Sequence, residues 1–231
     1  MSIVPFRKHE RRRRRPLDQA QIVGAALALL DDVGFDELTM RRLAERLGVQ
    51  AASLYRHVRS KDELLVLLAD EITAAIPLVE PTGTWREQLT RAAWNARRGL
   101  LSHRDAARVM ANTAPVGPRR LQHIEAVLRI LRSAGLSKRD AARTAHLCNN
   151  IVTEFAADEA RFAALAAMPG SSRKKVFAEA RRYFKSLPRA EFPMLVDLAD
   201  QLTEDDPDAL FQSSIDVMLD GIEKLAKRSS D

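Results

Sequence analysis

Residues 41–61 concentrate side chains that can bind an anionic polymer. Six cations stand there against the single acid Glu45, which leaves a formal charge of +5; they are Arg41, Arg42, Arg46, Arg56, Arg59 and Lys61. Ser53, Tyr55 and His57 add hydroxyl, aromatic and imidazole groups within the same stretch. Guanidinium and ammonium groups contact phosphates, and polar side chains can also contact the edges of bases. These residue types and their spacing predict contact with nucleic acid.

Two short helices joined by a turn must position these side chains. Thr39 is a suitable N-cap for a first helix that ends at Leu47, Gly48 permits the turn, and residues 50–57 form a second helix. Apolar residues at helical spacing are predicted to face a core: Leu43, Ala44, Leu47, Val49, Leu54 and Val58. The opposite face of the second helix then carries the polar and aromatic groups. The pattern predicts a helix-turn-helix that binds double-stranded DNA, with a plain surface hairpin as the alternative.

The N-terminal residues hold the net charge of the chain. The 231 residues include 37 Lys+Arg and 31 Asp+Glu, a formal charge of +6. Residues 1–15 alone contain seven cations and one acid, so the remainder is neutral and a uniformly basic protein is excluded. We expect residues 1–16 to be a disordered basic arm. Arg13, Arg14 and Arg15 would follow DNA phosphates or enter the minor groove, with a merely solubilising tail as the alternative.

The composition predicts a folded protein that is not exported. With 46% apolar residues the chain can bury a sizeable core, and its length suits one domain with an appendage or two modest domains. No uncharged stretch approaches the roughly 20 residues that cross a bilayer, and no apolar run follows the basic N-terminus. Cys148 is the single cysteine, so neither an intrachain disulfide nor a cysteine-only zinc site is available. We expect a cytoplasmic location and no membrane association.

Helical periodicity runs through the rest of the chain, where alternating β-branched stretches are absent. Residues able to cap a helix N-terminus precede several periodic segments: Asp18, Thr39, Ser60, Thr84, Ser102 and Ser137. Pro118 suits the first turn of a helix that ends at Gly135, and Pro169 and Gly170 begin the most loop-like stretch. Later helices are predicted over residues 173–187, 191–202 and 207–227. The fold class is therefore all-α, with about ten helices.

Residues 17–76 resemble the N-terminal domain of the tetracycline repressor (TetR) family of bacterial regulators. The resemblance is carried by LTMRRLAERLGV at residues 38–49 and LYRHVRSKDELL at residues 54–65. The stretch LLSHRDAARV at residues 100–109, followed by Thr113 and Pro115, also resembles the ligand-binding domain of the tetracycline repressor branch. The resemblance implies a helix-turn-helix DNA-binding domain over residues 17–62 and a larger helical ligand-binding and dimerisation domain over residues 63–231.

The resemblance also implies which residues contact DNA, because the helix that begins at Gln50 corresponds to the recognition helix of the family. The implied contacts are Arg41, Gln50, Ala51, Ala52, Ser53, Tyr55, Arg56, His57 and Lys61. Ala51 and Ala52 replace polar or proline residues of the tetracycline repressor. They can contact thymine methyl groups but cannot donate hydrogen bonds, so a different operator sequence is expected. For Tyr55 the alternative is a ring packed on the hairpin, with only the hydroxyl reaching DNA.

The function implied by the resemblance is that of a ligand-responsive repressor. It would bind a palindromic operator as a homodimer, joined by helices near residues 137–165 and 207–227, with recognition helices roughly 34–36 Å apart. A small-molecule effector would release it. Arg104 and Asp105 lie near the point where family members couple their two domains, although a solvated surface pair is equally compatible. An activator, or a regulator without a small-molecule effector, is the alternative.

The effector implied by the resemblance departs from tetracycline. In that branch the drug binds as a magnesium chelate through a histidine, and the aligned position here is Met110, whose thioether is a poor magnesium ligand. Two further drug-contacting positions read Ala92 and Ala96, whereas Thr113 is retained. We therefore expect a rather apolar effector. The candidate lining residues are Trp94, Met110, Thr113 and Phe155, each of which could instead be plain core.

Other reactive side chains do not suggest a catalytic or metal site. His103 and Asp105 are neighbours in a predicted first helical turn and would not face each other, and no activated nucleophile accompanies them. His146 with Cys148 is too sparse for zinc. Nine acids and no Lys or Arg lie in residues 191–220, which predicts a solvated face that repels DNA, with metal binding as the alternative. We predict no enzyme, cofactor or metal; an enzyme on a similar helical scaffold is the remote alternative.

Overall fold

The computed structural model describes residues 17–228, which form twelve α-helices and their connections, without strands. The helices are α1 (Gln19–Val33), α2 (Met40–Leu47), α3 (Ala51–Tyr55), α4 (Lys61–Ala74), α5 (Trp85–Leu101), α6 (Ala106–Ala111), α7 (Pro118–Ser133), α8 (Lys138–Ala166), α9 (Arg173–Ser186), α10 (Pro193–Asp197), α11 (Ala199–Leu202) and α12 (Pro207–Arg228). The all-α prediction is confirmed. The expected arm over residues 1–16, including Arg13, Arg14 and Arg15, lies outside the described residues.

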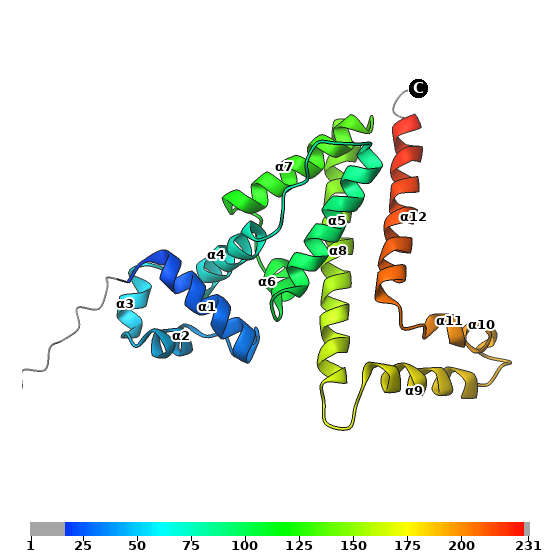
Figure 1. The fold of residues 1–231 in the computed structure, drawn as a ribbon, viewed down its shortest axis with the longest axis horizontal. Coiled ribbons are helices and arrows are strands. Elements are labelled where there is room, and N and C mark those ends of the chain that lie inside the picture. Colours follow the sequence, from blue (N-terminus) through cyan, green and yellow to red (C-terminus); the bar gives the residue numbers. More distant parts are fainter. Residues whose placement is uncertain (1–16, 229–231) are drawn as a thin grey trace, which may run out of the picture.

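The first three helices form a small layer at one end of the molecule (Figure 1). At the start of α1, the Asp18 carboxylate accepts a hydrogen bond from the Gln21 N–H at 2.8 Å, and the Gln21 side chain accepts one from the Asp18 N–H at 3.2 Å. Thr39 caps α2 as predicted, with its hydroxyl oxygen 3.2 Å from the Arg42 nitrogen. Side chains that are fully buried in this layer hold it together: Ile22, Ala26, Leu30, Leu38, Leu43, Leu54 and Val58.

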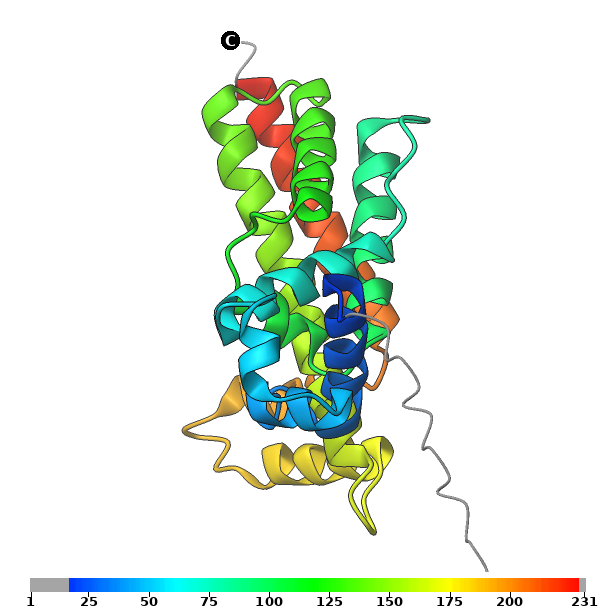
Figure 2. The same cartoon turned by 90° about the vertical axis from the view of Figure 1, so that its left-hand side faces the viewer.

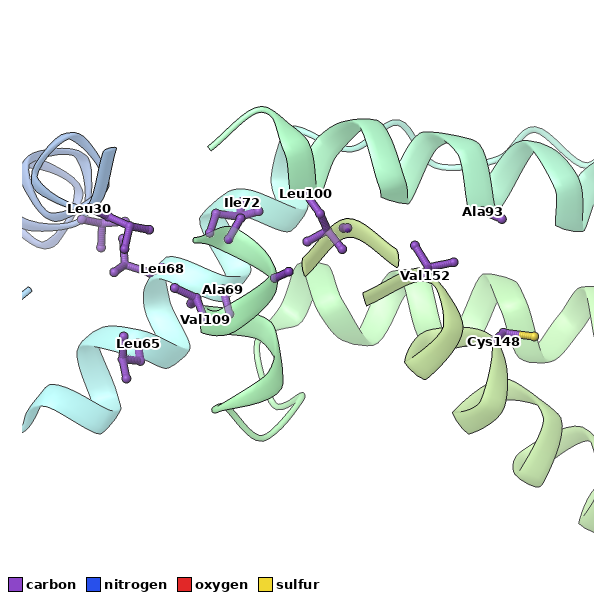
Figure 3. Packing of buried hydrophobic residues seen from close by; sticks show 14 of the residues in the cluster. Leu30, Leu65, Leu68, Ala69, Ile72, Ala93, Leu100, Val109, Cys148 and Val152 are labelled. Atoms are coloured by element: carbon purple, nitrogen blue, oxygen red, sulfur yellow. The ribbon is translucent and has the colours of Figure 1, made fainter. Parts of the chain in front are cut away.

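Helix α4 connects this layer to the larger domain. Its buried residues face both parts, and Figure 3 shows Leu68 beside Leu30 of α1, and Ala69 beside Val109 of α6. The buried apolar side chains thus form one continuous cluster. A displacement of α4 would therefore move packed side chains on both sides, because protein interiors are close-packed.

Four long helices make up the larger domain. Helix α8 packs against α5, α7 and α12; α5, α8 and α12 run side by side in Figure 1, whereas α7 slopes away from them, and Figure 2 shows the same helices from the side. Helices α9 to α11 extend sideways from the end of α8 in Figure 1, and α9 contributes no fully buried residue. Among the described residues, no helix is both long enough and apolar enough to cross a membrane.

The structure corrects two of the predicted boundaries. Ser102 does not begin a helix; it follows α5, and its hydroxyl donates to the Gly99 carbonyl at 2.7 Å. Helix α6 begins later, after Asp105 in a left-handed conformation with φ of 55°. The helix predicted over residues 191–202 is divided into α10 and α11, because Leu198 has φ of −97° and ψ of 11°, outside the helical region.

Candidate functional site

The predicted helix-turn-helix is formed by α2, α3 and the turn between them. Gly48 ends α2 in the left-handed conformation with φ of 64°, and its N–H bonds to the carbonyls of Ala44 and Glu45. A side chain at this φ is strained, so glycine suits the turn. Helix α3 is shorter than the predicted residues 50–57, because the segment after Tyr55 continues as a turn in which the Leu54 carbonyl accepts from the N–H groups of residues 57 and 58.

The face of α3 predicted to contact DNA is open to solvent. Gln50 and the α3 residues Ala51 and Ala52 are exposed, and Ser53 is half-buried. Tyr55 is 47% exposed, so it is accessible from solvent. Arg56 and His57 are exposed, and the Arg56 Nη2 donates to the Ser53 hydroxyl at 3.3 Å. The structure therefore brings these side chains together on one surface.

The cations of residues 41–61 are divided between two groups. Three cations of α2 are ion-paired on the surface: Arg41 with Glu45, Arg42 with Glu37 and Arg46 with Asp32. Within residues 17–228, the other three have no carboxylate within ion-pair distance: Arg56, Arg59 and Lys61. Lys61 lies 5.2 Å from the centre of the Phe35 ring. The cations without an ion pair thus lie between the end of α3 and the start of α4, where an anionic ligand would meet least competition.

The segment before α6 is bonded directly to the last turn of α1 and to the α1–α2 connection. The Asp105 carboxylate accepts from the Phe35 N–H at 2.8 Å, and the Arg104 N–H donates to the Asp31 carboxylate at 2.9 Å. The Arg104 guanidinium also donates to the Asp32 carbonyl at 3.0 Å. Arg104 and Asp105 therefore contact the small domain and do not form an isolated solvated pair.

Two further side chains strengthen this junction between the domains. Arg108 makes two hydrogen bonds to the Asp36 carboxylate, at 2.8 and 3.0 Å, and lies 4.7 Å over the Phe35 ring. The hydrogen bond from Arg108 lowers the pKa of Asp36. His103 Nδ1 lies 3.0 Å from the Asp31 carboxylate and not against Asp105. His103 thus belongs to the junction, and the geometry does not form a His103–Asp105 catalytic pair.

The hydrogen bond from Phe35 to Asp105 is expected to stabilise the junction measurably. Asp105→Ala leaves this amide without its partner and places alanine in a left-handed conformation, so we expect the free energy of unfolding to fall by about 1–3 kcal/mol. Asp105→Asn is the matched control, because its amide oxygen can still accept and asparagine tolerates this conformation. Urea unfolding at fixed protein concentration measures both variants. Equal midpoints for the alanine and asparagine variants would show that the hydrogen bond contributes nothing.

The predicted ligand residues lie in two places: Trp94 and Phe155 around Phe211, and Met110 and Thr113 at the end of α6. Trp94 and Phe155 are half-buried and both contact Phe211 edge-on, with ring centres 5.0 and 5.4 Å apart. The Trp94 indole also donates to the Gln212 side chain at 2.8 Å. Met110 is half-buried on α6. Thr113, after α6, donates from its hydroxyl to the Val109 carbonyl at 2.9 Å.

Arg97 is a buried charge that the sequence did not single out. It is 3% exposed and bonds to the Glu159 carboxylate at 2.7 and 3.0 Å and to the Asp208 carboxylate at 2.7 Å. Burial alone would lower its pKa, but the hydrogen bonds to Asp208 and Glu159 outweigh it and raise the pKa. Its guanidinium lies 4.9 Å from the Trp94 and the Phe211 ring centres. Arg97 therefore ties α5 to α8 and α12.

The remaining reactive residues have ordinary partners. His146 is exposed beside Asn150, whereas the Cys148 thiol is buried and donates to the Met218 sulfur at 3.5 Å. Burial raises the pKa of Cys148 to about 12, so the thiol stays protonated. Of the nine acids in residues 191–220, five are paired with cations from other segments: Asp197, Asp200, Asp205, Asp208 and Asp220. All nine acids are exposed, as expected of a solvated face, and ion pairs balance the charges of these five.

Both parts of the chain match known families. Residues 22–68 match the model for bacterial regulatory proteins, tetR family, and residues 76–226 match the tetracyclin repressor-like C-terminal domain. The tetracycline repressor protein class A from transposon 1721 of Escherichia coli is 35% identical over 208 residues, covering 88% of this chain and 89% of that protein.

Solved structures extend the similarity to the whole fold. Apo ActR from Streptomyces coelicolor has a TM-score of 0.81 and 36% identity, covering 92% of this chain and 99% of ActR. The complex of ActR, a TetR family protein, with actinorhodin has a TM-score of 0.80 and 37% identity, covering 90% of this chain and 96% of that chain. The similarity therefore spans both the helix-turn-helix layer and the larger helical domain.

Proposed function

Because this chain belongs to the tetR family of bacterial regulatory proteins, we propose that it is a repressor that binds a palindromic DNA operator as a homodimer and is released by a small-molecule effector. The observation that carries the proposal is the exposed face of α3, where Arg56 is solvent-accessible and has no carboxylate partner within residues 17–228. The proposal includes a cytoplasmic location and assigns no chemical reaction, cofactor or metal ion to the protein.

The DNA contacts follow from this face and its flanks. Ser53 and Arg56 contact bases or phosphates, and Tyr55 and His57 contact the DNA backbone. Gln50, Ala51 and Ala52 face the major groove from the start of α3. Lys61 contacts a phosphate, and Arg41 reaches the groove from α2 once it exchanges Glu45 for DNA. Arg13, Arg14 and Arg15 of the arm add phosphate or minor-groove contacts.

The homodimer is supported by the outer surface of α8 and α12. An apolar groove of about 440 Å³ runs between these helices; it is lined by Thr144, Leu147, Ile151, Ser214, Val217, Met218, Gly221, Ile222 and Leu225. Leu147 is 51% exposed and Val217 is 72% exposed. Apolar surface of this kind marks an interaction site. A second copy packed on it buries the same side chains twice, as two-fold symmetry requires.

Release requires the effector to favour one conformation of the protein over another, because it can shift the equilibrium only by its differential affinity. The junction formed by Asp105, Arg108 and the α1–α2 connection gives such a change a direct path to the helix-turn-helix. ActR is solved in complex with actinorhodin, which supports a small-molecule effector here. Trp94, Met110, Thr113 and Phe155 are the proposed contacts, and Met110 argues against a magnesium-dependent drug.

The operator contact is tested by Arg56→Ala, measured by gel shift on DNA from immediately upstream of the chain's own gene and on random DNA. We expect operator affinity to fall about 10- to 100-fold, because a bidentate base contact contributes about 1–3 kcal/mol, and random-DNA affinity to fall far less. Arg182→Ala removes the same charge from an exposed position on α9 and should change neither. Equal losses on both DNAs would reduce Arg56 to a phosphate contact. A wild-type protein without operator preference would refute the proposed function.

A further inference from the structure

Two arginines of the larger domain are more than nine-tenths buried, and they differ in how their charge is neutralised. Arg97 is 3% exposed and is held by the carboxylates of Glu159 and Asp208. Arg120, on the first turn of α7, is 7% exposed, yet within residues 17–228 no carboxylate lies within 4.0 Å of its guanidinium. A buried charge is costly unless it is paired, so Arg120 requires an explanation that Arg97 does not.

The contacts of Arg120 use only one of its nitrogens. Nη1 donates to the Thr113 hydroxyl at 2.6 Å and lies 3.3 Å from the Thr113 carbonyl and 3.4 Å from the Ala114 carbonyl. All three acceptors are neutral. Burial lowers the pKa of Arg120, and the charge of Asp70 opposes this effect only in part. Arginine nevertheless stays protonated in proteins, so the guanidinium carries a positive charge here without a directly paired carboxylate.

Asp70 on α4 is not free to supply that anion. Its Oδ1 accepts from the backbone N–H groups of Arg119 and Arg120, at 2.8 and 3.1 Å, and so caps the N-terminus of α7. Gly117 permits this approach, because a Cβ there would lie 2.3 Å from the same oxygen. Asp70 thus ties α4 to the backbone of α7 and leaves the Arg120 side chain unpaired.

The unused edge of the guanidinium faces solvent-accessible space. Nε and Nη2 of Arg120 have no hydrogen bond to the described residues. Among these residues, however, no side-chain nitrogen or oxygen that is fully shielded from solvent lacks a partner. Both nitrogens must therefore remain accessible although the residue is 93% buried. Nε and Nη2 form the edge of arginine that can bind a carboxylate with two parallel hydrogen bonds.

We propose that Arg120 binds a carboxylate of the effector through Nε and Nη2, while Nη1 remains on Thr113. The inference deepens the proposed function and rests on it, since it specifies the effector as an anionic molecule with an apolar body. Two of the proposed effector contacts are close in the chain: Met110 lies on α6, and Thr113 lies in the segment that follows α6. A carboxylate bound to Arg120 would act on α7 and, through Thr113, on the end of α6. Because Asp70 bonds α4 to the backbone of α7, the carboxylate would also affect α4, which packs against the helix-turn-helix layer.

Matched pairs of aromatic probes test the charge requirement directly: benzoate, 2-naphthoate and 9-anthracenecarboxylate, each against its own carboxamide. Calorimetric titration of the wild-type protein should show at least one carboxylate that binds about tenfold or more tightly than its amide. Arg120→Gln can still donate to Thr113 but lacks the charge, so it should abolish this difference by weakening the carboxylate alone. Arg119→Gln removes an exposed charge one residue away and should preserve the difference.

Three outcomes would overturn the inference. They are the absence of a carboxylate preference in all three pairs, an equal loss of carboxylate and amide binding in Arg120→Gln, and an equal effect of Arg119→Gln. Arg120→Lys keeps the charge without the planar fork and should retain a reduced preference, which checks the result if the glutamine variant unfolds. Gel shift without probe reports operator binding separately, so failure of the repressor proposal can be told apart from failure at Arg120.

Discussion

Val217→Asp is expected to make the protein monomeric and to lower operator affinity by about 100-fold or more. Val217 is 72% exposed on α12, beside the apolar groove that we propose as the dimer interface. Two-fold symmetry would bury the new carboxylate twice, and a buried unpaired charge costs several kcal/mol, where about 1.4 kcal/mol is a factor of ten. Asp216 and Asp220 nearby would add repulsion. A monomer engages one half-site and loses the gain from binding both halves together.

Sedimentation velocity and gel shift on the same samples measure the two effects. Val116→Asp is the matched control, since Val116 is 61% exposed but precedes α7, away from the groove. It should leave both the sedimentation coefficient and the operator affinity unchanged. A Val217→Asp protein that stays dimeric would place the subunit contact elsewhere and remove the argument for two recognition helices set by α8 and α12.

Local helix signals could be predicted from the sequence because their partners lie within one turn. Thr39, Thr84 and Ser137 all accept from the N–H three residues later, as their spacing predicted. Gly48 takes the left-handed conformation expected of a turn between two helices. Ser60 caps α4, because its hydroxyl accepts from the Glu63 N–H, and the Glu63 carboxylate in turn accepts from the Arg59 N–H.

Contacts between distant residues could not be predicted in this way. The Ser102 pattern resembled a helix start, yet Asp105 instead bonds to Phe35, 70 residues away. The ion pairs of the acids in residues 191–220 could not be predicted, because their partners lie elsewhere in the chain, such as Arg97 for Asp208 and Lys185 for Asp200. The composition gives the number of charged residues but not which of them form ion pairs.

In the candidate site, too, local features could be predicted from the sequence and contacts between distant residues could not. The face of α3 could be predicted, because periodicity separates its buried Leu54 from the exposed Tyr55 and Arg56. Arg97 and Arg120 could not, because each is one of many arginines on helices rich in charge. Burial decides their roles, and burial depends on which helices pack against them. The contact of Trp94 and Phe155 with Phe211 could not be predicted either, because the three rings come from different helices.

Phe211→Ala is expected to lower the free energy of unfolding by about 3–5 kcal/mol, the usual cost of truncating a buried phenylalanine. Phe211 is fully buried and packs edge-on against Trp94 and Phe155. The Arg97 guanidinium, 4.9 Å from its ring centre, would also lose an aromatic partner. Urea unfolding at one fixed protein concentration gives the value, because the stability of a dimer depends on concentration.

Phe192→Ala is the control, because Phe192 is 40% exposed and its loss should cost far less. The comparison also separates the two interpretations of Trp94 and Phe155. A loss of several kcal/mol in Phe211→Ala means that these rings are close-packed, so an effector must displace them or bind toward Thr113 and Arg120. A loss below about 1 kcal/mol would mean that the rings are loosely packed and already leave room for a ligand.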